Sequence, residues 1–291
     1  MTILDGKGTA QEIRKELKEK VESLKNNGER PPHLAAVLVG DDGPSHTYVN
    51  AKVKDCRQIG YESTLVDLPA TISEKDLLDK VDQLNNDDNI DGFIVQLPLP
   101  DHIDENEIIA AINPNKDVDG FHPENFGRMA LNLPSFISAT PRGIVELLDR
   151  YDIETEGKHC VVIGRSNIVG TPISILMSRN NKVGNATVTV THSRTKNLKE
   201  ITQQADIVIA AIGNPYFLKA EMVKEGAVVI DVGMSRVEDA SKKRGYRLAG
   251  DVDFDKVKEK ASHITPVPGG VGPMTRAALL LNTFRAYSIK K

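Results

Sequence analysis

The sequence predicts an α/β protein with two αβ domains and a cleft between them, the second a Rossmann-type doubly wound parallel sheet. Buried apolar runs alternate with amphipathic helical segments along most of the chain, a pattern typical of parallel sheets. A length of 291 residues suits two domains of ordinary size. The stretch 113–141, rich in proline, glycine and asparagine, separates two such series of elements and predicts a domain boundary.

The first series begins with an amphipathic helix at residues 9–26, where Ile13, Leu17 and Val21 share one face. The elements that we expect after it are a strand at 34–39, a helix at 45–58, a strand near Thr64, a helix at 74–84 and a strand at 90–96. Proline at positions 98 and 100 ends this series abruptly.

The second series follows the boundary stretch. We expect its strands at 158–163, 186–191, 206–212 and 227–232, with helices at 170–179 and 275–287. Residues 1–139 would form the first domain, completed by the C-terminal helix 275–291, and residues 140–274 the second. The sequence alone does not place the last helix.

Composition and charge exclude several classes of protein. Lysine and arginine number 37 against 41 acidic residues, so no basic excess points to nucleic acid or an anionic membrane. The first twenty residues are too charged for a signal peptide, and no apolar run approaches a membrane span. Cys56 and Cys160 form neither a C-x-x-C motif nor a Cys/His cluster, so we expect no disulfide, no metal site and a cytoplasmic location.

A glycine turn opens the second series. Val161 to Gly170 reads as a buried strand, a tight turn and a helix start, the context of a dinucleotide site, although Ser166 replaces the second glycine of G-x-G-x-x-G. A plain turn in which Gly164 relieves strain fits the spacing equally well. Free N–H groups at the helix start and the Ser166 hydroxyl favour phosphate binding.

The end of the next strand indicates which cofactor. An NAD site normally has a carboxylate there to hold the ribose hydroxyls. This strand ends instead in His192, Ser193, Arg194 and Thr195. Arg165, Ser193 and Arg194 suit a 2′-phosphate, which favours NADP over NAD, although Arg194 alone also fits a solvated surface residue.

Tyr48 and Lys52 share a face of the helix expected at 45–58, and Gln96 ends a strand at the carboxyl edge of the first sheet. A lysine there carries protons only if burial lowers its pKa. Each residue also has an ordinary interpretation, as a solvated lysine, a packed tyrosine or a capping glutamine. Asp117 and Asp119, just past this sheet, fit either turn formation or a carboxylate that accepts two N–H donors from a pterin edge.

Five motifs in order along the chain carry a family resemblance. They are Tyr48-Val49-x-x-Lys52-x-Lys54, Gln96-Leu97-Pro98-Leu99-Pro100, Pro114-x-Lys116-Asp117-Val118-Asp119-Gly120, Gly164-Arg165-Ser166-x-x-Val169-Gly170-x-Pro172 and the segment from Thr265 to Thr275. On these residues the chain resembles the bifunctional methylenetetrahydrofolate dehydrogenase/methenyltetrahydrofolate cyclohydrolase family over nearly its whole length.

The resemblance implies NADP-dependent oxidation of 5,10-methylenetetrahydrofolate to the methenyl form, and hydrolysis of that cation to 10-formyltetrahydrofolate, in one-carbon metabolism. Lys52 would be the acid/base, Tyr48 would orient the pterin, Gln96 would hydrogen-bond Lys52 and Asp119 would hold the pterin edge. These four are the expected catalytic residues. The resemblance also implies a homodimer.

The binding residues that the resemblance implies fall into two sets. The substrate set adds Leu97, Pro98, Pro268, Gly269, Gly270 and Val271 to those four residues. The NADP set comprises Gly164, Arg165, Ser166, Ile168, His192, Ser193, Gly213 and Met234. Met234 stands where many members carry isoleucine.

Other functions fit the residues less well. A shikimate dehydrogenase-like NADP reductase explains the glycine turn but not the Tyr48, Lys52 and Gln96 set. A non-enzymatic folate or dinucleotide module would not need Lys52. The turn lacks the second glycine of a G-x-S-x-G nucleophile elbow, and no P-loop for ATP-driven formate activation is present.

Overall fold

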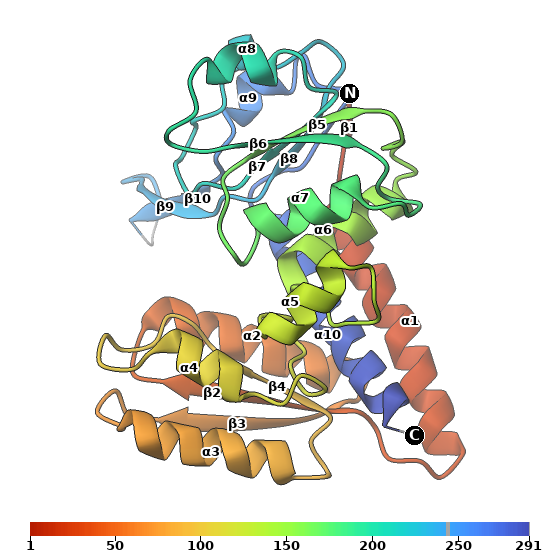
Figure 1. Cartoon of the computed structure of the whole chain (residues 1–291), viewed down its shortest axis with the longest axis vertical. Coiled ribbons are helices and arrows are strands. Elements are labelled where there is room, and N and C mark those ends of the chain that lie inside the picture. The colour runs from red at the N-terminus through yellow and green to blue at the C-terminus, as the bar shows by residue number, and fades with distance from the viewer. Residues whose placement is uncertain (243–244, 291) are drawn as a thin grey trace. The chain divides into compact units, whose positions relative to one another are not determined.

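A computed structural model describes residues 1–242 and 245–290 of the chain (Figure 1). The chain divides into two compact units. We name the unit of Gln11–Ala139 and Arg276–Lys291 the small-sheet unit, and that of Met1–Ala10 and Thr140–Thr275 the large-sheet unit. Residue 291 of the expected C-terminal helix lies outside the described residues. The boundaries between units fall inside the helices α1 (Gly6–Asn26), α6 (Ala139–Arg150) and α10 (Val271–Ile289).

The sheet of the small-sheet unit is parallel, with strand order β3-β2-β4. Its elements are β2 (His33–Val39), α2 (Gly43–Ile59), β3 (Glu62–Leu68), α3 (Glu74–Asn86), β4 (Gly92–Val95), α4 (Glu105–Ala111) and α5 (Pro123–Ala130). Figure 1 shows α2 and α3 on opposite sides of this sheet. Ala35, Val37 and Val39 of β2 pack in one cluster with Leu77 and Val81 of α3. Because both faces are covered, the central strand β2 is continuously apolar from Leu34 to Val39 rather than alternating.

Helix α2, which carries Tyr48 and Lys52, has a defined start and end. The Asp42 carboxylate accepts a hydrogen bond of 2.8 Å from the Ser45 backbone N–H, so the helix begins at Gly43, before the expected residue 45. Gly60 ends it in the left-handed conformation, with φ of 84°.

The C-terminal helix belongs, from Arg276 onward, to the small-sheet unit. The Asn282 side-chain amide donates hydrogen bonds to the carbonyl oxygens of Val118 at 2.7 Å and Ile137 at 2.9 Å. The Tyr61 hydroxyl donates to the Leu280 carbonyl oxygen at 3.1 Å. Through Asn282, α10 is therefore hydrogen-bonded to the segment that contains Asp117 and Asp119.

The main sheet of the large-sheet unit is parallel, with strand order β1-β11-β8-β7-β5-β6. Its strands are β1 (Thr2–Ile3), β5 (His159–Ile163), β6 (Thr187–Thr191), β7 (Ile207–Ala210), β8 (Val228–Asp231) and β11 (His263–Ile264). The other elements are α7 (Gly170–Ser178), α8 (Leu198–Thr202), the 3-10 helix η1 (Ala220–Met222), α9 (Phe254–Val257) and the antiparallel pair β9 (Ser235–Glu238) and β10 (Tyr246–Ala249). Figure 1 shows α7 on one side of the sheet and α8 and α9 on the other, the doubly wound arrangement that the sequence predicts.

Two features differ from the expectation from sequence. Residues 1–10 were expected in the first domain, but Met1–Ala10 belongs to the large-sheet unit. The reason is that Thr2 and Ile3 pair in parallel with His263 and Ile264, a long-range pairing that two residues of sequence do not reveal. The pair β9 and β10 was also missed, because each strand is only four residues long and neither contains a continuous apolar run.

Candidate active site

A lysine and a glutamine from separate elements meet at the carboxyl edge of the small sheet. Lys52 lies in the middle of α2, and Gln96 directly follows β4. The Lys52 Nζ donates a hydrogen bond of 3.1 Å to Gln96 Oε1. The Gln96 amide nitrogen donates to the Leu97 carbonyl oxygen at 2.7 Å, which orients the amide with its oxygen toward the lysine.

Burial acts on the charges of Lys52 and Asp119 in opposite directions. It lowers the pKa of the Lys52 ammonium group, and the negative charge of Asp119 opposes that shift. Burial likewise raises the pKa of the Asp119 carboxyl group, a shift that Lys52 opposes and Asp117 reinforces. A lysine with a lowered pKa is neutral for a larger fraction of the time near neutral pH, which is what proton exchange requires.

The structure assigns different environments to Asp117 and Asp119. Asp117 is buried, and its carboxylate accepts hydrogen bonds of 2.9 to 3.2 Å from the backbone N–H groups of Gly120, Phe121 and His122. Turn formation therefore falls to Asp117. Asp119 is only partly buried, and it is the carboxylate whose charge acts on the lysine.

The other residues expected around the substrate divide between the units. Tyr48, one turn before Lys52 on α2, keeps 40% of its surface exposed and can contact a ligand. Leu97 and Pro98 follow Gln96 in the small-sheet unit and are joined by a cis peptide bond. The set from Pro268 to Val271 lies in the large-sheet unit, ahead of and at the start of α10.

The glycine-rich loop at Pro268 is held by the start of α1. The Gly269 carbonyl oxygen accepts a hydrogen bond of 2.8 Å from the Lys7 backbone N–H, and a Cβ at Gly6 would overlap the Gly270 carbonyl oxygen. Pro268 is exposed, whereas the side chain of Val271 is buried in the unit. Contact with a ligand here falls to Pro268 and the glycine backbone.

The glycine turn between β5 and α7 presents exposed residues at the carboxyl edge of the large sheet. Gly164 has φ of 112°, and a Cβ there would overlap the Ala211 carbonyl oxygen, so this turn requires glycine. Arg165, Ser166 and Ile168 that follow it are exposed.

The Ser166 hydroxyl differs from the expectation. Its oxygen accepts hydrogen bonds from the backbone N–H groups of Val169 at 3.2 Å and Gly170 at 3.3 Å. Ser166 therefore bonds to the backbone at the start of α7, and two of the N–H groups expected to face a phosphate are already bonded. The hydroxyl proton can still be donated to a ligand.

The segment after β6 is stabilised by its own hydrogen bonds. The His192 backbone N–H donates to Thr195 Oγ1 at 2.9 Å, and the Arg194 N–H donates to His192 Nδ1 at 3.2 Å. Ser193 and Arg194 are exposed at this edge. No Asp or Glu stands between His192 and Thr195 to bind ribose hydroxyls.

The last expected cofactor residues lie in the loops after β7 and β8. Gly213 has φ of 69° and is exposed, and a Cβ there would meet no atom within 4 Å. Met234 is 40% exposed. The cofactor residues expected from sequence therefore come together along one sheet edge, each after the carboxyl end of a parallel strand.

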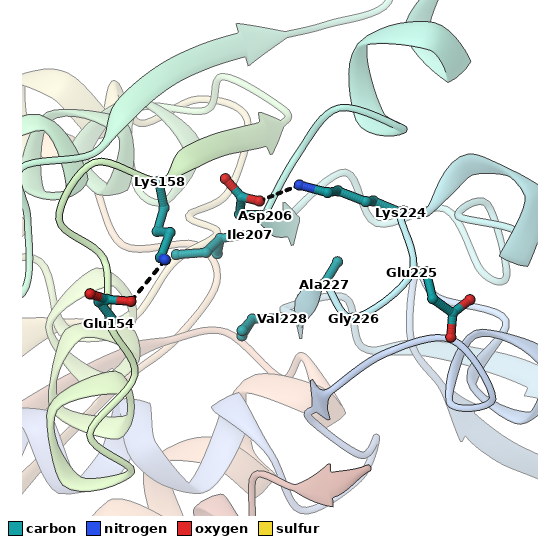
Figure 2. Close-up of a pocket in the computed structure, with 9 residues that line it drawn as sticks. All are labelled: Glu154, Lys158, Asp206, Ile207, Lys224, Glu225, Gly226, Ala227 and Val228. Carbon is teal, nitrogen blue, oxygen red and sulfur yellow. Dashed lines mark hydrogen bonds and ion pairs between the residues drawn. The ribbon is translucent and has the colours of Figure 1, made fainter.

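The large-sheet unit also has a surface pocket, which lies away from these expected cofactor residues. Figure 2 shows two ion pairs in its lining, Lys158 with Glu154 and Lys224 with Asp206. Ile207 and Val228 in its lining begin β7 and β8. The pocket thus lies at the amino edge of the sheet, opposite the edge where ligands of such folds bind.

Residues 1–242 and 245–290 contain no cluster of His, Cys, Asp and Glu that could hold a metal ion. In those same ranges no helix is long and apolar enough to cross a membrane. Cys56 and Cys160 are buried and unpaired, and burial raises the pKa of each thiol to about 12, which disfavours a reactive thiolate.

Comparison with known families agrees with this geometry. Residues 4–119 match the catalytic domain of tetrahydrofolate dehydrogenase/cyclohydrolase, and residues 138–291 match the NAD(P)-binding domain of the same enzyme. The chain belongs to this family. It is a bifunctional enzyme, a methylenetetrahydrofolate dehydrogenase and methenyltetrahydrofolate cyclohydrolase.

Individual members of the family are similar over their full length. The bifunctional protein FolD of Cytophaga hutchinsonii is 64% identical, with 100% of both chains covered. The solved FolD of Campylobacter jejuni is 46% identical, with a TM-score of 0.94 and 100% of both chains covered. The Trypanosoma brucei enzyme, solved with NADP and an inhibitor, is 39% identical, with a TM-score of 0.94 and coverage of 100% of this chain and 98% of that one.

The shikimate dehydrogenase alternative is supported only at the level of fold. The enzyme of Aquifex aeolicus is 14% identical, with a TM-score of 0.51 over 89% of this chain and 92% of that one. This likeness reflects a shared two-domain α/β plan.

Proposed function

We propose that Lys52 carries the proton in the cyclohydrolase step of this enzyme, and that NADP is its hydride acceptor in the dehydrogenase step. The observation that carries the first part is the hydrogen bond of Lys52 to Gln96 at a position where burial lowers the lysine pKa. The amide oxygen of Gln96 accepts from either protonation state of the amine, so it orients Lys52 without fixing its charge.

The cyclohydrolase step needs a group that takes and returns a proton. Water adds to the methenyl carbon of the cation, and neutral Lys52 takes a proton from that water. The protonated lysine then gives a proton to the ring nitrogen as its bond to the former methenyl carbon breaks, and the carbinol proton is released as the formyl group forms. The charge of Asp119 favours the protonated form of Lys52 and burial favours the neutral form, so both forms are accessible during the reaction.

Substrate binding falls to residues around Lys52. Tyr48 stacks on the pterin and aminobenzoyl region from the same face of α2. Asp119 accepts hydrogen bonds from the pterin edge, a role consistent with its incomplete burial and with the turn being held by Asp117. Leu97 and Pro98 complete the substrate set in the small-sheet unit, and the large-sheet unit adds Pro268 and the glycine backbone that follows it.

The dehydrogenase step requires orientation more than proton transfer. When bound, NADP accepts the hydride from the methylene carbon. The residues that would hold it are Gly164, Arg165, Ser166, Ile168, His192, Ser193, Gly213 and Met234. They fit such a group because they are exposed or partly exposed at the carboxyl edge of a Rossmann sheet, apart from Gly164, which allows the tight turn.

The preference for NADP over NAD rests on charge. Without a carboxylate at the end of β6, nothing there repels a 2′-phosphate, and the exposed Arg165 and Arg194 can bind one.

We also propose that the enzyme is a cytoplasmic homodimer. The buried, unpaired Cys56 and Cys160 suit a reducing compartment. β3 lies at one edge of the small sheet, is seven residues long and exposes 41% of Leu65, features that favour association with a second copy. Sedimentation of the wild type and of Leu65→Lys tests this, with a monomeric wild type contradicting it.

One assay tests the cofactor and both reactions together. The purified chain is mixed with methylenetetrahydrofolate and either NADP or NAD, while reduced cofactor and methenyl product are followed. We expect formation of reduced cofactor with a clear preference for NADP in kcat/KM, and loss of methenyl product by hydrolysis. Equal use of both cofactors would contradict the charge argument.

A further inference from the structure

Two buried carboxylates lie at the carboxyl edge of the large sheet and have no part in the reaction above. Asp231 ends β8, and Asp251 follows β10; they are 2% and 0% exposed. Over residues 1–242 and 245–290, no lysine or arginine forms an ion pair with either. Burying two carboxylates without a positively charged partner destabilises the fold unless hydrogen bonds offset the cost of removing them from water.

Asp251 holds the loop after β7. Its Oδ2 accepts hydrogen bonds from the backbone N–H groups of Ile212 at 2.7 Å and Gly213 at 3.0 Å. Its other oxygen, Oδ1, is buried without a hydrogen-bond partner. The carboxylate is thus directed at the backbone of one loop, the loop that contains the exposed Gly213.

Asp231 holds Asp251 in turn. The Asp231 Oδ1 accepts from the Asp251 backbone N–H at 2.8 Å, and its Oδ2 accepts from the Val252 N–H at 3.0 Å. The Asp231 N–H donates to Thr265 Oγ1 at 2.7 Å, directly before the loop of Pro266 to Gly270. Asp231 therefore fixes the segment on which Asp251 stands.

Glycines make this arrangement possible. A Cβ at Gly233, in the loop after β8, would overlap Asp251 Oδ1, and one at Gly250 would overlap Asp231 Oδ2. Gly164 similarly packs against the Ala211 carbonyl oxygen, one residue before the backbone that Asp251 holds. The loops after β7 and β8 thus pack against the Asp251 carboxylate, and the glycine turn after β5 packs against the Ala211 carbonyl oxygen next to the backbone that Asp251 holds.

We propose that Asp251 is a positioning residue for the dinucleotide: its carboxylate fixes the Ile212–Gly213 backbone and, through Ala211, the Gly164 turn in the conformation that binds the cofactor. This inference rests on the proposed NADP site. The free-energy cost of burying the two acids supports the proposal. Burial raises the pKa of Asp251, and it raises the pKa of Asp231 to about 7. Such a cost is typical of groups retained to orient a functional site.

The test separates cofactor binding from general stability, because the cyclohydrolase step uses no cofactor. In Asp251→Ala we expect the Kd and KM for NADP to rise at least about tenfold, as two hydrogen bonds to a charged acceptor are lost. Methenyltetrahydrofolate hydrolysis should stay within about twofold of wild type, since no hydrogen bond to Lys52 or Gln96 changes. Asp251→Asn keeps one acceptor oxygen and should restore most of the NADP affinity.

Asp255→Ala is the matched control, because Asp255 is an exposed carboxylate of the same unit, paired with Lys258 at 2.7 Å. It should alter neither activity. A folded Asp251→Ala with wild-type affinity for NADP would overturn the proposal, as would equal loss of both activities.

Amide hydrogen exchange covers the case in which the alanine variant does not fold. In Asp251→Asn the Ile212 and Gly213 amides should exchange faster than in wild type, because a charged acceptor becomes a neutral one. Unchanged exchange there would overturn the proposal. Titration of the wild type with NADP comes first, so that a chain that does not bind NADP is recognised as a failure of the proposed function instead.

Discussion

The carboxyl edges of the two sheets are built differently. At the small sheet, the side chains themselves face one another, with Lys52 bonded to Gln96 and acted on by the charge of Asp119. At the large sheet, the buried carboxylates of Asp231 and Asp251 accept hydrogen bonds from backbone N–H groups, and the residues exposed at that edge lie in loops. Chemistry requires a side chain with an adjustable charge, whereas binding a phosphate and a ribose requires backbone held in a fixed shape.

Lys52→Met tests the chemical edge and should have the largest effect. Methionine is a good helix former of similar length but has no exchangeable proton. Hydrolysis of methenyltetrahydrofolate should fall at least about a hundredfold, the low end of what one acid/base group contributes. Dehydrogenation should survive in part, because hydride transfer itself moves no proton.

Both activities and the melting temperature of the variant are measured together. Wild-type hydrolysis by a folded Lys52→Met would remove this lysine from the mechanism. A collapse of the melting temperature would instead make Lys52 a structural residue.

Asp231→Asn tests the binding edge through pH. The pKa of Asp231 is raised to about 7, so its protonated form stabilises the folded state at low pH, and this stability is lost as pH rises toward 7. Between pH 5 and 8 the wild type should lose on the order of 2 kcal/mol from this group. The asparagine variant should lack that slope, since its amide does not titrate.

Denaturant unfolding of both proteins across this pH range measures the difference. Asp251 is the acid whose charge acts on Asp231, and it is present in both proteins, so it does not produce the difference by itself. Parallel pH profiles would show that Asp231 is ionised throughout.

Local rules predict the elements of this chain well and its long-range contacts poorly. Apolar runs located β2, β5 and β7 within a few residues, because buried parallel strands are continuously apolar. The pairing of β1 with β11 and the place of residues 1–10 depend on contacts about 260 residues apart, which no local pattern contains.

The site shows the same division. Lys52 and Gln96 were candidates because of their places on a helix face and at a strand end, and the family resemblance assigned their roles. Asp231 and Asp251 were missed, although a carboxylate directly after the apolar run 227–230 is a signal that could have been read. Their partners are backbone N–H groups of other loops, so only the folded structure shows what they hold.

Lys116→Met sharpens the comparison by using a second lysine of the small-sheet unit. Burial lowers the pKa of Lys116 too, but its Nζ donates to the carbonyl oxygens of Leu84 at 2.9 Å and Asp87 at 2.7 Å, at the end of α3. Removing it should cost about 2 kcal/mol of stability, since two carbonyl groups lose a charged donor. The kcat of both reactions should remain near wild type in the folded variant.

Chemical denaturation and the two assays at a temperature below the transition check this. Lys52→Met should lower the rate of hydrolysis without lowering stability, whereas Lys116→Met should lower stability without changing either rate. Reversal of that pattern would exchange their roles.

Arg165→Ala tests the exposed surface of the binding edge and should have the smallest effect. Arg165 is exposed at the glycine turn, so its loss should leave the fold intact. Because only NADP has a 2′-phosphate, kcat/KM with NADP should fall about tenfold, the loss of one charge-assisted bond, while that with NAD changes little. Steady-state kinetics with both cofactors measure the ratio, and cyclohydrolase activity serves as the internal control. If the kcat/KM values for NADP and NAD fall together, Arg165 shapes the turn instead. Recognition of the 2′-phosphate is then assigned to Ser193 and Arg194 at the end of β6. Arg194→Ala, measured in the same way, tests that assignment.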